Sequence, residues 1–185
     1  MQMSQRRGFS MIELLTTLII MGMIAAMAVP RIDMSRMRSD AGVRQITTLL
    51  VQAQRTALSK QYNVIISIDA PNNRMRLVED KNNSNTYDAG DRMVWMALEP
   101  GVKFVPSPTP IDGMSGTVVF LRPKLIDAYP SVIFRRNGAA SSDGAMFISS
   151  KPTDPGATRA VGITQSTGRA DAYKYTGAAW VRAGA

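Results

Sequence analysis

One apolar segment near the N-terminus constrains this chain more than any other feature. It runs from Phe9 to Val29, and Glu13 is its only charged residue. An apolar helix of about 20 residues is long enough to cross a lipid bilayer. Because Arg6 and Arg7 precede the segment, the positive-inside rule predicts a cytoplasmic N-terminus and an outward-facing remainder. We therefore expect one membrane-spanning helix over residues 9–29.

The same segment also fits an ordinary secretory signal peptide with a small-residue motif at residues 26–28, a plain membrane anchor, or a buried core helix. Glu13 favours a more specific role, because a carboxylate inside a membrane segment costs roughly 2.5–3.5 kcal/mol and is usually paired. Glu13 lies one helical turn after Phe9. If the chain were cut between Gly8 and Phe9, the new α-amine could pair with Glu13 of its own or a neighbouring subunit.

Residues 6–15 (RRGFSMIELL) resemble the cleavage-and-assembly signal of type IV pilins and type II secretion pseudopilins. In that family a prepilin peptidase cuts after the glycine and methylates the new N-terminal residue. The resemblance implies that residues 1–8 are a leader peptide, that the bond between Gly8 and Phe9 is cut, and that Phe9 becomes N-methylated. It also implies that Glu13 neutralises the N-terminal amine of an adjacent subunit in a filament.

The next thirty residues predict an amphipathic helix, which Pro30 would kink or separate from the apolar segment. Within residues 31–60, apolar side chains recur at spacings of three and four, which places them on one helical face. They are Val43, Ile46, Leu50, Ala53 and Ala57. Four arginines (Arg36, Arg38, Arg44 and Arg55) fall mostly off that face. They fit either a solvated surface or contacts with lipid headgroups or neighbouring subunits.

After Lys60 the pattern changes to short β-branched and alternating runs. Residues 62–69 and 74–79 predict a hairpin around a turn at 70–73. Further strands are predicted at residues 92–98, 102–105, 117–121, 131–135, 145–149, 159–164 and 169–175. We therefore expect an α+β fold, in which a long N-terminal helix packs on a β-rich domain. Its predicted parts are a membrane half (residues 9–29), an amphipathic half (30–60) and a periplasmic β-rich domain (61–185).

The C-terminal half is similar to the GspH/FimT branch of minor pilins and pseudopilins. The similarity lies in residues 132–138 (VIFRRNG), 145–148 (AMFI), 159–163 (RAVGI) and 167–169 (TGR). It implies the pilin fold and a filament subunit anchored in the bacterial inner membrane by a single pass. Its partners would be other pilins or pseudopilins, the prepilin peptidase and the inner-membrane assembly platform. The filament would be a type II secretion pseudopilus or a type IV pilus, with the subunit at its initiation site or tip.

A polar loop at residues 80–91 fits two interpretations. Its oxygen-bearing side chains have the spacing of a calcium loop, and the candidate ligands are Asp80, Asn82, Ser84, Asp88 and Asp91. However, Asn85 stands where glycine normally makes the sharp turn, and Asp91 replaces the usual bidentate glutamate. The alternative is a polar hairpin loop closed by side-chain hydrogen bonds to its own backbone.

The positive charge of the chain raises the question of nucleic-acid binding. The formal net charge is +8, and residues 131–185 contain seven Lys or Arg but three Asp. Candidate phosphate contacts are Arg169, Lys174 and Arg182, close to aromatic residues on which bases can stack. Some FimT-like pilins assist DNA uptake through a Gly-Arg-x-Arg motif, but here Asp171 replaces the second arginine. General solubility is the competing interpretation.

Composition argues against catalysis. The chain has neither Cys nor His, which excludes disulfides, thiolate zinc sites, cysteine nucleophiles and Ser-His-Asp triads. No glycine-rich phosphate loop follows a predicted strand. We therefore predict a protein that is not an enzyme and has no catalytic residues. Calcium in the 80–91 loop is the one cofactor that the sequence suggests.

Overall fold

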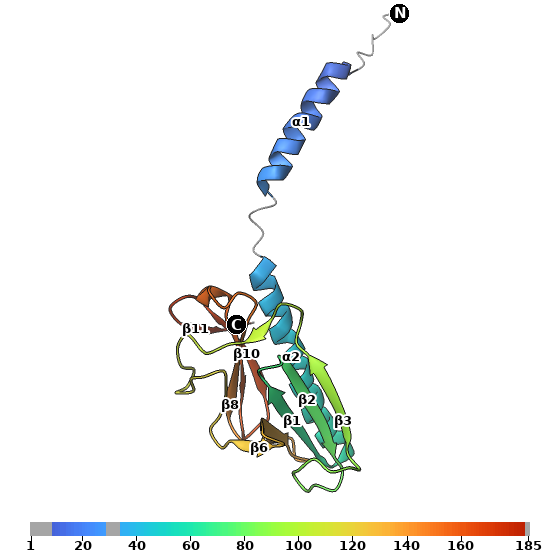
Figure 1. Cartoon of the computed structure of the whole chain (residues 1–185), viewed down its shortest axis with the longest axis vertical. Helices are drawn as coiled ribbons and strands as arrows, with labels where there is room; N and C mark the ends of the chain where they lie inside the picture. The colour runs from blue at the N-terminus through green and yellow to red at the C-terminus, as the bar shows by residue number, and fades with distance from the viewer. Residues whose placement is uncertain (1–8, 29–33, 184–185) are drawn as a thin grey trace, which may run out of the picture. The chain divides into compact units, whose positions relative to one another are not determined.

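The computed structural model describes residues 9–28 and 34–183, and it divides the chain into two compact units, residues 1–34 and 35–185 (Figure 1). Helix α1 (Met11–Ala28) belongs to the first unit, and helix α2 (Met34–Lys60) runs through the second. The predicted break at Pro30 and the predicted leader at residues 1–8 lie outside the described residues.

Helix α1 begins at the residues that carry the predicted processing signal. The backbone amides of Glu13 and Leu14 donate to the Ser10 carbonyl at 3.0 and 3.1 Å, which closes the first turn. Residues 9–25 are all exposed. Among the described residues, no helix has both the length and the apolar character that crossing a membrane requires.

Helix α2 buries the apolar face that its sequence predicts. Val43, Ile46, Leu50, Ala53 and Ala57 are all buried, together with Leu49 and two small residues, Ser39 and Gly42. The four arginines of this segment are exposed, as their positions off that face predict. At Gly42 the helix approaches its neighbours closely, because a Cβ there would lie 3.0 Å from side-chain atoms of Ile148 and Val102.

Within residues 34–183, eleven strands form two antiparallel sheets around α2. The strands are β1 (Asn63–Asp69), β2 (Arg74–Asp80), β3 (Arg92–Ala97), β4 (Lys103–Phe104), β5 (Val118–Phe120), β6 (Lys124–Ile126), β7 (Tyr129–Phe134), β8 (Gly144–Ser149), β9 (Arg159–Ile163), β10 (Ala170–Tyr175) and β11 (Trp180–Arg182). The 3-10 turn η2 (Pro155–Ala157) precedes β9. One sheet has the order β3-β2-β1-β7-β6; the other has the order β11-β10-β9-β8-β4, with β5 also paired to β8.

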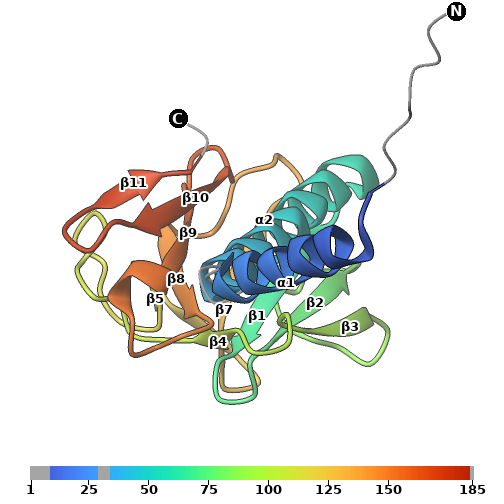
Figure 2. The same ribbon diagram turned by 90° about the horizontal axis from the view of Figure 1, so that it is seen from above.

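The main hydrophobic core lies where α2 meets both sheets. Its large, fully buried side chains include Ile46 and Leu50 of α2, Ile66 of β1, Phe134 of β7 and Ile148 of β8. In Figure 2 strands β1 to β3 spread to one side of α2 and strands β8 to β11 to the other. The predicted α+β fold, with a helix packed on antiparallel β-sheets, is confirmed.

Each strand predicted from the sequence is present, and the predicted hairpin forms with β1 and β2 paired from Asn63–Asp80 to Asp69–Arg74. Two strands were not predicted. Strands β6 and β11 have three residues each, and both pair at the end of a longer strand. Such short strands form because a partner strand is already in place, which no local sequence pattern reveals.

Candidate functional site

The exposed face of α1 is the first candidate site, and it combines apolar side chains with one carboxylate. Ile12, Leu15 and Ile19 are each at least half exposed. Glu13 lies in the first turn, where the helix dipole favours a negative charge. Its carboxylate has no hydrogen bond or ion pair with the part of the chain that the structure describes. It is therefore available to a cationic group of another molecule.

The structure describes only one of the two predicted processing residues. Phe9 is described and is 79% exposed, whereas Gly8 lies outside the described residues. Cleavage between them and methylation of Phe9 stay predictions. The exposed Phe9 lies just before the start of α1, so an α-amine created there would lie about one helical turn from the Glu13 carboxylate.

The five candidate calcium ligands do come together at the end of β2 and in the loop that follows it, but they form hydrogen bonds with one another and with the loop backbone. Asp80 accepts the backbone amides of Ser84 and Asn85 at 2.9 and 2.8 Å. Asp91 accepts the backbone amides of Lys81 and Asp88 at 3.2 and 3.0 Å.

The Asp88 carboxylate is held in the same way. Hydrogen bonds from Ser84 and Asn82, at 2.7 and 2.9 Å, keep the pKa of Asp88 below its ordinary value. Asn85 has a left-handed backbone with φ of 61°, which asparagine tolerates better than most residues. Within the described residues, no group of three or more acidic side chains has the arrangement that holds a metal ion. Calcium binding by this loop stays a prediction.

The three candidate phosphate contacts do not act as one free cationic surface. Arg169 pairs with Asp171 at 3.0 Å between its Nε and Oδ1, and Arg182 pairs with the same carboxylate oxygen. The residue that replaces the second arginine of the uptake motif therefore engages two of the three candidates. Lys174 makes no ion pair with any residue that the structure describes.

Lys174 and Arg182 line a groove of about 500 Å³ between α2 and the β10–β11 hairpin, and Arg169 is not part of its lining. Two further arginines line this groove, Arg44 of α2 and Arg159 of β9. Sequence reasoning missed Arg44 because more than one hundred residues separate it from Lys174 in the chain. It missed Arg159 because its place opposite Lys174 depends on the register of β9 and β10. Arg159 is nearly buried and pairs with Asp40, so the groove carries a mixed charge.

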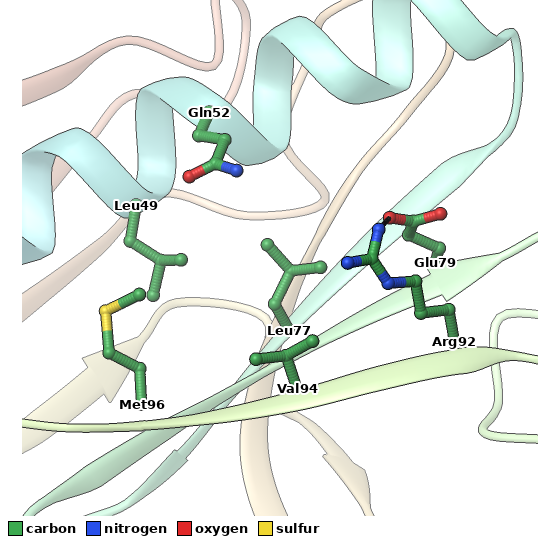
Figure 3. A pocket seen from close by; sticks show the side chains of 7 residues that line it. All are labelled: Leu49, Gln52, Leu77, Glu79, Arg92, Val94 and Met96. Atoms are coloured by element: carbon green, nitrogen blue, oxygen red, sulfur yellow. Dashed lines mark hydrogen bonds and ion pairs between the residues drawn. The ribbon is translucent and has the colours of Figure 1, made fainter.

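A smaller pocket of about 150 Å³ lies between α2 and strands β2 and β3 (Figure 3). Its walls are mainly apolar, from Leu49, Leu77, Val94 and Met96, with Gln52 on the helix side. An ion pair between Glu79 Oε1 and Arg92 Nη1, at 3.2 Å, lies at its edge. A pocket of this size and lining is suited to an apolar side chain.

Comparison with known proteins bears on the first of these sites. Residues 3–29 match the family model of the prokaryotic N-terminal methylation motif. The predicted type IV pilin-like signal is confirmed. The motif includes Gly8, Phe9 and Glu13 and the whole of α1, so the exposed helix and the processing signal are one continuous feature of the chain.

No curated protein matches this chain. Among solved structures, it is similar to the minor pseudopilin EpsH from the Type 2 Secretion System of Vibrio cholerae. The two share 11% sequence identity with a TM-score of 0.48, over 79% of this chain and 96% of that chain.

Proposed function

We propose that this protein is a minor pilin or pseudopilin of the GspH/FimT type, a filament subunit rather than an enzyme. One observation carries the proposal: the methylation motif leads directly into a helix whose apolar side chains are exposed and whose single carboxylate has no partner among the described residues. An exposed apolar helix of this kind gains stability by packing against other helices or lipid.

The proposed maturation follows from the order of residues at the N-terminus. A prepilin peptidase removes residues 1–8, and Phe9 becomes the N-methylated first residue. The apolar segment of residues 9–29, part of which lies outside the described residues, holds the subunit in the inner membrane with the β-rich domain in the periplasm. The assembly platform then moves the subunit into a type II secretion pseudopilus or a type IV pilus, at its initiation site or tip.

Glu13 is proposed to set the register between subunits. A carboxylate in an apolar interface is costly unless it is paired. The interface is therefore stable only when a neighbouring subunit places its N-terminal amine next to the Glu13 carboxylate. The positive charge of the amine and the negative charge of Glu13 then cancel within the helical bundle.

Mass spectrometry of the mature protein from native membranes tests the maturation. A chain that starts at N-methylated Phe9 is the expected result. A chain that starts at Val29 would mean that signal peptidase cuts after Ala28, and the filament proposal would be refuted. If the chain starts at Phe9, the genes that neighbour its own gene, for secretion or for a pilus, distinguish the two filament types.

The variant Glu13→Ala tests the role in assembly. It should still enter the membrane fraction, but its recovery in sheared filaments should fall strongly. Glu99→Ala is the matched control, because it removes an exposed carboxylate of the β-rich domain whose side chain has no described partner. Filament levels of Glu13→Ala equal to those of the control would contradict the register argument.

The groove that Lys174, Arg182, Arg44 and Arg159 line supports a second candidate, a minor pilin that binds DNA for uptake. Lys174 and Arg44 have no ion pair with any described residue, so these two basic side chains of the groove can contact a phosphate backbone. A gel shift of the full chain in detergent tests it. Binding should weaken with salt and in Lys174→Ala, and the absence of any shift at low salt would refute it.

A further inference from the structure

A polar pocket of about 390 Å³ lies at the end of the β-rich domain where α2 finishes and β1 starts. Three segments far apart in the chain line it, and the lining consists entirely of amides and guanidinium groups. The residues are Asn63 at the start of β1, Asn83 and Asn85 in the β2–β3 loop, and Arg135, Arg136 and Asn137 directly after β7.

Three of the four amide oxygens of this pocket, those of Asn83, Asn85 and Asn137, are already used inside the protein. The Asn83 Oδ1 accepts the backbone amide of Asn63 at 2.8 Å, and the Asn137 Oδ1 accepts the backbone amide of Ala139 at 3.1 Å. The Asn85 Oδ1 accepts the side-chain amide of Asn63 at 3.0 Å. Because the first two bonds come from backbone N–H groups, they fix which way the amides of Asn83 and Asn137 point.

Apart from the Oδ1 of Asn63, which accepts no hydrogen bond from the described residues, the groups left over are donors. The side-chain NH2 groups of Asn83 and Asn137 have no acceptor among the described residues. Arg135 and Arg136 are exposed, and neither guanidinium pairs with an acidic side chain in the part of the chain that the structure describes. A ligand for this pocket must therefore supply acceptors and negative charge.

One carboxylate lies next to the pocket, and its negative charge contributes to the electrostatics of the site. Asp80 pairs with Asn63 in the β1–β2 register and is fully buried. It accepts hydrogen bonds from the backbone amides of Ser84 and Asn85, so it is turned into the loop. The two positive charges of Arg135 and Arg136 outnumber the single negative charge of Asp80, and the two guanidinium groups are exposed whereas Asp80 is buried.

We propose that this pocket binds an oxyanion of the phosphate or sulfate type. Two guanidinium groups match a doubly charged tetrahedral anion better than a carboxylate, and guanidinium N–H groups form strong charge-assisted bonds with such oxygens. The NH2 groups of Asn83 and Asn137 supply neutral donors at the same pocket. This site is separate from the groove next to β10 and β11, and the inference goes beyond the filament function without depending on it.

Isothermal titration calorimetry of the full chain in detergent, in phosphate-free buffer, tests the proposal with inorganic phosphate, sulfate and acetate. Phosphate and sulfate should bind more tightly than acetate. The double variant Arg135→Ala/Arg136→Ala should raise the dissociation constant for phosphate at least about tenfold, since each charge-assisted bond is worth about that factor. Arg38→Ala, an exposed arginine in the first turns of α2, is the matched control and should change nothing.

A second variant separates binding from folding. Asn137→Asp keeps the oxygen that accepts the Ala139 amide but replaces the free NH2 donor with a negatively charged oxygen. It should preserve the turn and the unfolding temperature and still weaken phosphate binding. Absence of phosphate binding, or equal binding by the parent chain and the double variant, would overturn the proposal.

The source of the anion is identified by competition. If a short single-stranded oligonucleotide displaces phosphate from the parent chain and loses affinity in the double variant, the pocket accepts phosphodiester groups. If the oligonucleotide does not compete while phosphate binds, the pocket takes free or terminal phosphate groups. Either result supports an oxyanion site.

Discussion

Replacing Gly168 by alanine should destabilise the β-rich domain severely, because this buried glycine lies in the connection between β9 and β10 with no room for a side chain. Gly168 has φ of +65°, and an added Cβ would lie 2.1 Å from the carbonyl oxygen of Gly138. It would also lie 2.6 Å from the side-chain nitrogen of Gln54. The first neighbour is backbone, so the turn itself must move rather than a flexible side chain.

The expected loss in the free energy of unfolding has two parts. An alanine in left-handed backbone costs about 1–2 kcal/mol. Movement of the turn also breaks the two bonds that Gln54 donates, to the Gly138 carbonyl at 2.8 Å and the Thr167 carbonyl at 2.6 Å. Each such bond is worth about 0.5–1.5 kcal/mol. The sum is about 2–5 kcal/mol, which corresponds to a fall in melting temperature of roughly 4–20 °C for a chain of this size.

Thermal unfolding of the full chain in detergent, followed by circular dichroism, measures this loss. Gly113→Ala is the matched control, because its φ is +78° and nothing lies within 4 Å of an added Cβ. It should show the backbone cost alone. Gln54→Ala should show the loss of the two hydrogen bonds. A melting temperature for Gly168→Ala no lower than that for Gly113→Ala would refute the reasoning.

Three further results are expected. Asp127→Ala should lower the free energy of unfolding by ~2–4 kcal/mol in urea, because Asp127 pairs at 2.6 Å with Arg76, whose side chain is nearly buried; an unchanged midpoint would contradict this. Burial, and then the hydrogen bond to Glu79, raise the pKa of Tyr62 to about 12. The stability that Tyr62 contributes is therefore complete below pH 10 and lost towards pH 12, and Tyr62→Phe should remove this loss in urea titrations. Because the carboxylates of the 80–91 loop are satisfied internally, adding calcium should leave the melting temperature unchanged; a rise of several degrees would establish a calcium loop.

Much of the fold could be predicted because its signals are local. The buried face of α2 follows from the spacing of Val43, Ile46 and Leu50, and the first hairpin follows from two alternating runs around a turn. Strand β11 could not be predicted, because its place depends on a distant contact. Trp180 packs against Phe147 and Tyr175 with ring centroids 5.6 and 5.1 Å away, and its Nε1 donates to the Thr109 carbonyl.

The candidate sites also differ in how far each could be predicted from the sequence. The processing signal is contiguous in the sequence, so it could be recognised without a structure. The pairing of Arg169 with Asp171 follows from their two-residue spacing, but the pairing of Arg182 with the same carboxylate needs the register of β10 and β11. The pocket around Arg135 joins residues more than seventy positions apart and leaves no local pattern.

The way α2 is attached also determines how the β-rich domain responds to mechanical load. Any pull on the apolar N-terminal segment reaches this domain through Met34, the first residue of α2. From there to Ala57 the helix is fixed by eight buried residues packed against both sheets. A force along the helix axis therefore shears all of these contacts together instead of separating strands one hydrogen bond at a time. This geometry suits a subunit that is drawn out of a membrane by its own N-terminus while its folded domain stays intact.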